Sequence, residues 1–407
     1  MMGVAIAAKR EFMNRLIRTA AAVLTATLVA ALAPVARAAD PYEINVILPL
    51  TGTIAFVGTT QLQALKAVEA YVNKTGGISG RQLSFVVQDD GSDVKTALQL
   101  AQALIAKNVP LIMGSSSPQA CAAIAPLVMS NGPVHYCLAN AGTTVPGSYE
   151  FFTQCSNDAQ LAVLVRYFRE RGMKKIASIF SIDGGGQDAE HALTAALALP
   201  ENKDVQLVAH EHFAPGDIGV AAQMSHIKEA APNVLIAWAT GGPAGTLLRS
   251  ERDAGIDFPT VTSTGNLSAN FFKQFGAILP TNLYLAAVPY YAGDALNSGA
   301  TKAAVATMTS ALAAIGSKPD MIEISGWDPA MIVVDALRKL GPDASAAKLR
   351  AYLLNVRGWV GADGPYDFHA NPQRGVGEAN VVIVRWDAAA NTAMAVSKPG
   401  GALLPIK

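Results

Sequence analysis

From about the fortieth residue onward, short uninterrupted apolar runs alternate with segments whose apolar residues recur at helical spacing. The first pair is the strand-length run 44–48 and the amphipathic segment 61–74, where apolar residues return every three or four positions. Strands without polar alternation are typical of parallel sheets that helices cover on both faces. The alternation therefore predicts an α/β protein built on parallel sheets.

The alternation runs twice along the chain, which predicts two lobes. In the first run, strands are expected at 44–48, 83–88, 111–113 and 134–138, and helices at 61–74, at 94–107 and after 118. In the second run, strands are expected at 176–180, 205–210 and 234–239, and helices at 161–171, from 189, at 218–230 and at 246–255. The Gly-rich segments 49–58, 183–186 and 240–245 are expected to be loops. Right-handed crossovers would place all strand-end loops of a lobe on one side.

The last third of the chain does not predict a third lobe. It contains expected strands at 284–288 and 381–386 and expected helices at 303–315 and 328–340. We expect these segments to complete the two existing sheets, and the several crossings between lobes to form a hinge.

The N-terminus has the three parts of a secretory signal. Four basic residues precede an uncharged apolar run at 20–33, and Ala36-Arg37-Ala38 follows a helix-breaking proline. The apolar run is too short for a membrane span, which needs about 20 residues. We therefore expect residues 1–38 to be a signal peptide cleaved near Ala38, and the mature chain to be a soluble protein of the periplasm.

Charge and motif content argue against nucleic-acid binding and catalysis. Basic and acidic residues number 31 each, so no basic excess would neutralise phosphates. No nucleophile elbow, phosphate-binding loop or H-E-x-x-H motif is present. His210 and His212 would share one strand face and could bind a metal, with Glu211 pointing away, but such a pair is more often a solvated surface. We expect no enzyme activity, no cofactor and no metal site.

Three cysteines, at 121, 137 and 155, lack the C-x-x-C spacing of redox or zinc sites. Cys137 and Cys155 fall near the ends of two successive expected strands and could form a disulfide. Free buried thiols at both positions fit the sequence equally well.

Several segments, taken in order, carry a family resemblance. They are Leu48-Pro49-Leu50-Thr51-Gly52, the run 73–80 (NKTGGISG), Asp89-Asp90-Gly91, Met113-Gly114-Ser115-Ser116, Ala125-Pro126, Leu248-Arg249 with Ala254-Gly255, and 361–367. Together with the signal peptide, they resemble the type I periplasmic binding proteins, in particular the leucine/isoleucine/valine-binding receptors of ABC importers.

The resemblance implies two Rossmann-like lobes with mostly parallel sheets, joined by a three-crossing hinge and closing on a small ligand. Lobe I would hold 40–157 and 291–361, and lobe II would hold 158–290 and 362–407. It also implies an ABC permease of the inner membrane as partner, and we expect a monomer. Ligands of such sheets sit beyond the carboxyl ends of the strands.

In the first lobe, Ser116 and Ser117 follow an expected strand and open a helix. Hydroxyls, backbone N–H groups and the helix dipole suit a carboxylate, although a bare helix cap explains the same residues. The family places a carboxylate-binding serine in this loop. The family also binds the ligand through the loop that corresponds to Ala139, Asn140 and Ala141. Ala141 stands where the family has a hydroxyl residue, so that hydrogen bond is lost or moves to Thr143. An ordinary loop is the alternative.

In the second lobe, the family's ammonium-binding acid falls near Gly265 and Asn266, and neither is acidic. A buried ammonium without a counter-charge is costly, so an α-amino acid fits poorly unless Asp183 or another acid moves in. Two family tyrosines fall on the smaller Gly185 and Thr240.

The family's first-lobe tyrosine falls on Val57, beside Phe56. The site therefore looks roomier than in the branched-chain receptors, which hints at an amine-free aromatic or keto acid. Trp238 and Trp327 are candidate stacking rings, although core positions are the more usual explanation.

These expectations converge on a solute receptor of an ABC importer. Its ligand would be a small carboxylate, either like a branched-chain amino acid or amine-free, bound between the lobes. The alternative is a sensory receptor that presents the same closure to a signalling partner.

Overall fold

The computed structural model describes residues 6–7, 9–16, 40–139, 141–296, 299–390 and 392–404. The chain forms two compact units, residues 1–40 and 41–407. In the first unit, residues 9–16 are helical. The predicted apolar run at 20–33 and the cleavage site near Ala38 lie outside the described residues, so the signal peptide stays a prediction. In the described part of the chain, no helix has both the length and the apolar character needed to cross a membrane.

The described part of the second unit contains two large sheets and a two-stranded one, and the first large sheet is entirely parallel. Its strands are β1 (Tyr42–Leu48), β2 (Leu83–Asp89), β3 (Leu111–Met113), β4 (Val134–Cys137) and β5 (Glu150–Phe152), in the order β2-β1-β3-β4-β5. Helices α2 (Ala55–Lys74), α3 (Val94–Ala106) and α4 (Pro118–Val128) follow the first three strands. Even-numbered side chains of β1 pack with α2, while Ile47 packs with α3 and α4, so helices cover both faces.

The second sheet has seven strands in the order β14-β13-β10-β9-β8-β6-β7. The strands are β6 (Lys175–Ser181), β7 (Gln206–Phe213), β8 (Val234–Trp238), β9 (Thr260–Thr262), β10 (Leu283–Ala287), β13 (Val382–Asp387) and β14 (Thr392–Ala395). β6 to β10 are parallel, and β13 is antiparallel to both of its neighbours. The helices of this half are α5 (Asn157–Glu170), α6 (Gly184–Leu197), α7 (Ala221–Glu229), α8 (Gly242–Asp253) and α9 (Ala269–Phe275).

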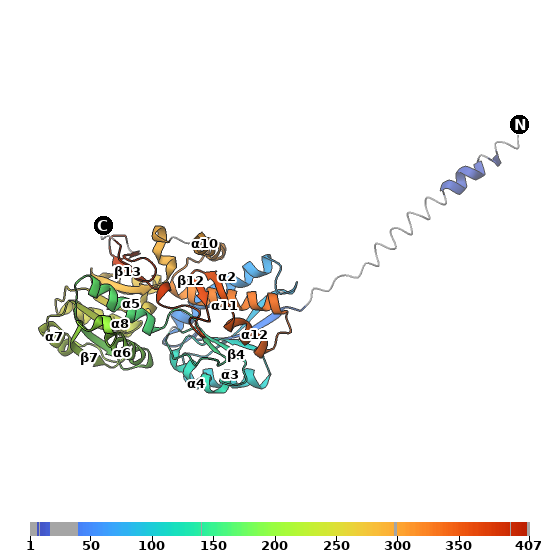
Figure 1. Cartoon of the computed structure of the whole chain (residues 1–407). Helices are drawn as coiled ribbons and strands as arrows, with labels where there is room; N and C mark the ends of the chain where they lie inside the picture. The colour runs from blue at the N-terminus through green and yellow to red at the C-terminus, as the bar shows by residue number, and fades with distance from the viewer. Residues whose placement is uncertain are drawn as a thin grey trace. The chain divides into compact units, whose positions relative to one another are not determined.

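The last third of the chain contributes to both halves, as predicted. It forms α10 (Gly299–Ala314), α11 (Met321–Leu340), α12 (Ala346–Leu354) and the hairpin of β11 (Arg357–Gly361) with β12 (Gly364–Asp367). α10 and α11 pack against α2, which is far away in sequence (Figure 1). The first sheet thus gains helices rather than a strand, whereas β13 and β14 extend the second sheet. Short 3₁₀ turns lie at Pro200–Asn202, Thr264–Asn266, Gly276–Ile278, Pro289–Ala295 and Glu378–Asn380.

The chain passes between the halves three times, after β5, after β10 and after β12. This confirms the predicted fold class of two mostly parallel α/β lobes with three crossings. The predicted lobe boundary between 361 and 362 falls inside the β11–β12 hairpin, and the exact boundaries stay a prediction.

The later parts of all three segments predicted as loops belong to helices, including 242–245, which begins α8, and close backbone packing explains one glycine in each of the other two. α2 begins at Ala55, and a Cβ at Gly58 would lie 2.2 Å from the backbone oxygen of Pro49. α6 begins at Gly184, and a Cβ at Gly186 would lie 1.8 Å from the backbone oxygen of Ser181. Glycine is therefore required for helix–strand contact at these positions, rather than for a turn.

The predicted disulfide between Cys137 and Cys155 is wrong. Cys137 is bonded to Cys121 of α4, with an S–S distance of 2.07 Å, and Cys155 is a buried free thiol. Alternate residues of a strand face opposite sides of the sheet. Cys137 therefore lies on the α4 side, whereas Cys155 belongs to the core cluster that also contains Tyr136 and Leu138, which face the other side of the sheet.

Candidate functional site

A cavity of about 450 Å³ lies between the two halves of the second unit. Its lining comes from loops at the carboxyl ends of strands in both sheets, where ligands of parallel sheets bind. Eight of the ten predicted site residues line it: Phe56, Ser116, Ser117, Ala139, Ala141, Gly185, Thr240 and Gly265. Of the other two, Asn140 lies outside the described residues and Asn266 is buried behind the lining.

The first-half wall is built on the loop between β3 and α4. Ser117 is the N-cap of α4, and its hydroxyl accepts a hydrogen bond from the backbone N–H of Ala120 at 3.3 Å. The first turn of a helix carries N–H groups without intrahelical partners, and its dipole favours an anion. This end of the cavity is therefore suited to a carboxylate.

Gln61 of α2 connects this wall to two other elements. Its Oε1 accepts a hydrogen bond from the Ser116 hydroxyl. Its Nε2 donates to the backbone oxygen of Leu138 at 2.9 Å and to Oγ of Ser325, in α11, at 2.8 Å. Because Gln61 is buried, it fixes the orientation of Ser116.

Beneath the loop, the Ser115 hydroxyl donates to Oδ2 of buried Asp90 at 2.5 Å. Burial raises the pKa of Asp90, and hydrogen bonds from Ser115 and from the backbone N–H of Ser92 partly offset that rise. The Ser115 hydroxyl thus stabilises the loop from beneath. Ser116 and Ser117 are the serines of this loop that line the cavity.

The loop after β4 contributes mainly small apolar surface. Ala139 and Ala141 line the cavity. The hydroxyl residue Thr143 does not, because it borders a separate depression with Gly142 and Thr144. Of the two alternatives for the family's hydroxyl contact, loss or transfer to Thr143, the geometry does not support the transfer.

The second-half wall begins at the N-terminus of α6. Asp183 is the N-cap of this helix: Oδ1 accepts from the backbone N–H of Gly186 at 2.9 Å, and Oδ2 accepts from the Ser181 hydroxyl at 2.8 Å. Among the described residues that line the cavity, Asp183 is the sole charged side chain. It supplies negative charge on the wall opposite α4.

Asn266 supports this wall without facing the cavity. Its Oδ1 accepts from the backbone N–H of Gly241 at 2.9 Å, and its Nδ2 donates to the backbone oxygen of Ala239 at 2.8 Å. The side chain thus holds the loop after β8, where Thr240 lines the cavity and donates to Oγ of Ser263 at 3.1 Å. It is a positioning residue of the cavity rather than part of its surface.

Two aromatic rings, Phe56 and Trp238, line the cavity. Trp327 does not, because it packs against Tyr71 in the core, with ring centroids 5.9 Å apart. The Phe56 ring extends from the first half to the second, since a Cβ at Gly241 would lie 3.6 Å from its Cε1. The Cβ distance would be an ordinary contact, so glycine at 241 is explained by its φ of 70° rather than by the ring.

Sequence reasoning missed several polar lining residues, among them Gln61, Gln154, Asn157, Ser263 and Ser325. Ser325 lies in the first turns of α11, which begins at Met321 instead of the predicted 328. The missed signal was the pair Asp320 and Glu323, which form a capping box at its start.

Two parallel α/β halves with three crossings and a cavity between their strand ends define a two-lobed small-molecule-binding protein. The chain belongs to the periplasmic binding protein family, whose model matches residues 41–392. This family is extracytoplasmic, and its members bind solutes rather than catalyse reactions.

Curated relatives are named for amino acids. The leucine-, isoleucine-, valine-, threonine- and alanine-binding protein of Pseudomonas aeruginosa is 26% identical over 236 residues, which cover 57% of this chain and 62% of that protein. The chain thus spans less than two thirds of this relative's length. The Leu/Ile/Val-binding protein BraC3 of Rhizobium johnstonii is 24% identical over 332 residues, covering 78% of this chain and 84% of that protein.

Solved structures show the same fold. Rp1789 of Rhodopseudomonas palustris has a TM-score of 0.76 and 21% identity, covering 88% of this chain and 100% of that chain. The substrate-binding protein LivJ of Streptococcus pneumoniae, in complex with isoleucine, has a TM-score of 0.73 and 18% identity, covering 88% of this chain and 99% of that chain.

Proposed function

We propose that this chain is the solute receptor of an ABC importer and that it binds a small carboxylate-bearing ligand in the cavity between its halves. The observation that carries the proposal is the pair of opposed walls, with the α4 N-terminus on one side and Asp183 on the other. Family membership supports a receptor, and the names of the relatives support an amino acid as ligand.

The ligand that fits best is an α-amino acid with an apolar side chain. Its carboxylate would meet Ser116 and Ser117, and its ammonium would meet Asp183. Its side chain would lie against Phe56, Trp238 and the small residues Gly185 and Gly265. A ligand with a carboxylate alone would leave Asp183 without a cation, at a cost in electrostatic energy.

The amine-free alternative has its own support. Gly265 and Asn266 supply no acid, and both oxygens of Asp183 already accept hydrogen bonds from the protein. A carboxylate has further lone pairs, so these bonds leave room for an ammonium. We therefore favour the amino acid and make the keto acid the competing arm of the test.

The test is a thermal-shift screen of mature protein that has been unfolded, washed and refolded to remove carried-over ligand. The panel contains leucine, isoleucine and valine, their 2-keto acids, and benzoate. A ligand at 100 times its Kd stabilises by about 2.7 kcal/mol, which is readily measured. Stabilisation by amino acids is the expected result. Stabilisation by keto acids alone would establish the amine-free alternative, and a silent panel would contradict both.

Asp183→Asn separates the two ligand classes, because asparagine also caps helices. We expect the affinity for leucine to fall at least about tenfold, from the loss of a hydrogen bond between charged groups, with no loss for a keto acid. Asp253→Asn, an exposed acid at the end of α8, is the matched control. Equal leucine affinity in Asp183→Asn and wild type would refute the assignment of the ammonium to Asp183.

The transport role has a separate test in cells. Deleting the gene should abolish uptake of the labelled ligand, and a periplasmic fraction should contain the chain with a new N-terminus after Ala38. Unchanged uptake combined with altered gene expression on ligand addition would favour the sensory role instead.

A further inference from the structure

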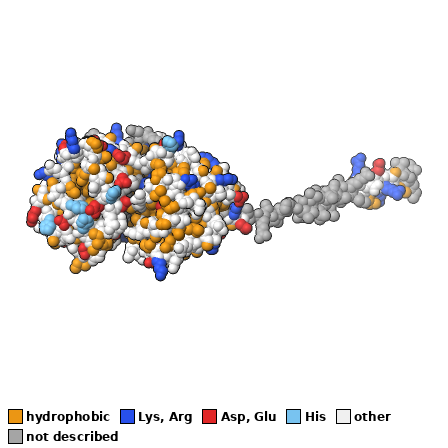
Figure 2. Space-filling view, turned by 60° about the horizontal axis from the view of Figure 1, so that its bottom comes forward, with side chains coloured by type: hydrophobic (Ala, Val, Ile, Leu, Met, Phe, Trp, Pro, Cys, Tyr) orange, Lys and Arg blue, Asp and Glu red, His pale blue; other side chains and the backbone are white. Residues whose placement is uncertain are grey.

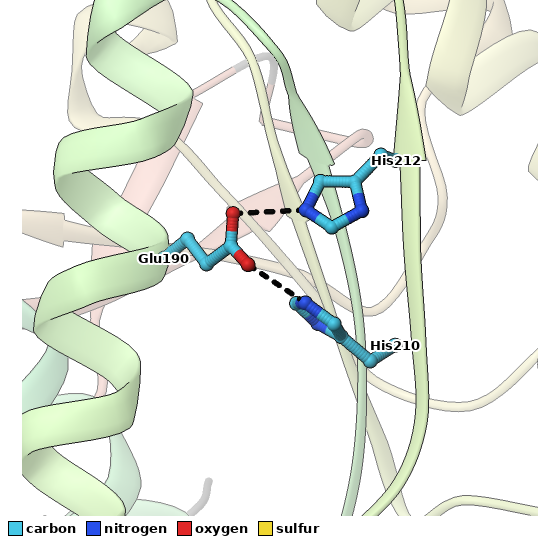
Figure 3. A group of neighbouring side chains, drawn as sticks. All are labelled: Glu190, His210 and His212. Atoms are coloured by element: carbon cyan, nitrogen blue, oxygen red, sulfur yellow. Dashed lines mark hydrogen bonds and ion pairs between the residues drawn. The ribbon is translucent and has the colours of Figure 1, made fainter.

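Away from the cavity, Glu190 of α6 meets His210 and His212 of β7 (Figure 3). β7 is the edge strand of the second sheet. Residues two apart on a strand share a face, so both rings point toward the helix that covers that face. Glu190 Oε1 lies 2.8 Å from Nε2 of His210, and its Oε2 lies 2.9 Å from Nε2 of His212.

The three side chains present one ligand atom each within a small volume. These atoms all lie within 4.8 Å of one another. In a tetrahedral zinc site, with metal–ligand distances of 2.0–2.1 Å, ligand atoms lie about 3.3 Å apart. The side chains are 35%, 43% and 31% exposed for His210, His212 and Glu190, so they are free to converge and open to solvent.

The surroundings of His210 suit a metal at its Nε2. A ring nitrogen that binds a metal carries no proton, so the other nitrogen must hold it and donate it. Nδ1 of His210 lies 2.9 Å from the hydroxyl oxygen of buried Ser178, which can accept that bond. In this structure Nε2 donates to Glu190, so a metal would displace that proton, and Ser178 would then accept the hydrogen bond from Nδ1 and hold the orientation of the ring.

Glu190 supplies the negative charge. A glutamate carboxylate is ionised at neutral pH because its ordinary pKa is about 4.3. Two imidazoles and one carboxylate form a ligand set that binds zinc and neighbouring transition metals in preference to Mg²⁺ and Ca²⁺.

We propose that Glu190, His210 and His212 form a three-ligand surface site for a divalent transition-metal cation, with Zn²⁺ as the best fit. Three protein ligands leave the remaining position to water, so the ion would exchange readily. The site lies on one side of the molecule, where histidines gather over the β7 and α7 half (Figure 2). A bound ion would fasten α6, whose first turn lines the cavity, to the sheet edge.

The opposite face of β7 offers an internal control. There Glu211 Oε1 pairs with Nδ1 of His226, from α7, at 3.3 Å. This pair provides only two ligands and lacks a third histidine or acid within reach among the described residues. His226→Ala therefore removes an exposed His–Glu contact without touching the proposed site.

The test is calorimetric titration of chelator-treated, full mature protein with ZnCl₂ alone, using protein without a polyhistidine tag. One Zn²⁺ per chain is expected. His210→Ala with His212→Ala should reduce the affinity by more than the roughly 10- to 100-fold typical of outer-shell changes. Ser178→Ala should cost about tenfold, and His226→Ala should leave the affinity within about twofold of wild type.

Glu190→Gln keeps the size of the side chain and serves if the double variant fails to fold. It should weaken Zn²⁺ binding, and Zn²⁺ should raise the Tm of wild type but not of this variant. Three outcomes would each overturn the proposal: no binding up to about 1 mM Zn²⁺, wild-type affinity in the His210/His212 double variant or in Glu190→Gln, or equal affinity for Ca²⁺. The first outcome would leave the cluster as a hydrogen-bonded tie between α6 and β7.

Discussion

Ser116 and Ser117 differ in what their hydroxyls already do, although they are neighbours. Ser116 donates to buried Gln61, and Ser117 caps α4. The Ser117 hydroxyl also donates to Oε1 of Gln119 at 3.1 Å, so a ligand carboxylate at this wall would compete with two internal hydrogen bonds while lying at the N-terminus of α4. The polar end of the cavity is preorganised by these bonds rather than formed on binding.

Replacing both serines tests the carboxylate wall. Ser116→Ala with Ser117→Ala should weaken ligand binding at least tenfold, since hydrogen bonds to a charged group contribute about 1.5–3 kcal/mol. The dissociation constant is measured by calorimetry with the ligand found in the screen. Ser156→Ala, which removes the equivalent cap of α5 outside the cavity, should lower Tm but leave the affinity unchanged. An unaltered dissociation constant in the double variant would remove both serines from the site.

Buried Glu251 of α8 predicts a pH dependence of stability. Burial raises its pKa to about 8, with a partly opposing hydrogen bond from Thr260 at 2.5 Å. In the unfolded chain the pKa is about 4.3, so the folded state keeps a proton that the unfolded state releases between these values. Its contribution is complete below about pH 4.3 and is lost as pH rises toward 8.

Glu251→Gln cannot titrate and should remove this slope. Urea unfolding at pH 5 and pH 8 should show wild type losing a few kcal/mol more than the variant, because each unit of pKa shift corresponds to about 1.4 kcal/mol. Exposed Glu201→Gln should follow wild type. Parallel stability curves for wild type and Glu251→Gln would show that the buried carboxyl does not hold its proton.

At the residue scale, the sequence predicted those site residues that follow strands in recognisable loops, such as Ser116, Gly185 and Thr240. It did not predict Gln61, because a glutamine within an amphipathic helix is usually a solvated residue. The spacing of His210 and His212 indicated a possible metal pair, which we took for a solvated surface, and it did not indicate Glu190, which lies on another element. The spacing of residues along the sequence does not predict which side chains of different elements come into contact.

At the scale of elements, the disulfide joins α4 to the end of β4. The two cysteines are separated by 16 positions, and a loop of about this size lowers unfolded-state entropy by an amount worth roughly 3 kcal/mol. α4 carries Ser117 at its start, so the crosslink also secures the helix whose N-terminus forms the first wall.

Removing the crosslink should destabilise the protein only under oxidising conditions. Cys121→Ala with Cys137→Ala should lower unfolding free energy by about 2–4 kcal/mol relative to oxidised wild type. Reduced wild type should resemble the variant, while Cys155→Ala should keep the full response to reductant. A wild-type Tm that does not change on reduction would contradict the pairing.

The order and type of the main elements were predictable, because long apolar runs and helical periodicity survive without tertiary information. Starts of helices were less predictable, because Gly58 and Gly186 read locally as turns. Both glycines are needed because the backbones of Pro49 and Ser181 pass too close to leave room for a Cβ. The short strands β5, β9 and β14 were missed, since three or four residues carry too little pattern.

At the scale of the whole molecule, each half is assembled from segments distant in sequence. α10 and α11 cover the first half, while β13 completes the second with Val382, Ile383 and Val384 fully buried. Neither half has a continuous stretch of chain that contains its whole core.

Truncation tests this interdependence. A mature chain that ends at residue 376 lacks β13 and β14, so β10 loses its antiparallel partner. We expect it to lose cooperative urea unfolding, followed by circular dichroism, and expect a peptide of residues 377–407 added in trans to restore it. Cooperative unfolding of the truncated chain alone would show that the late strands are dispensable.

The late position of β13 also sets an order of events during synthesis. A ribosome makes β1 to β12 before β13, the strand that pairs with β10 in the second sheet, becomes available. Until then the core of the second half is incomplete, and the polypeptide can stay unfolded enough to pass through a translocation channel. For a protein proposed to cross a membrane before it works, a second sheet that needs β13 delays folding until all the earlier strands have been made.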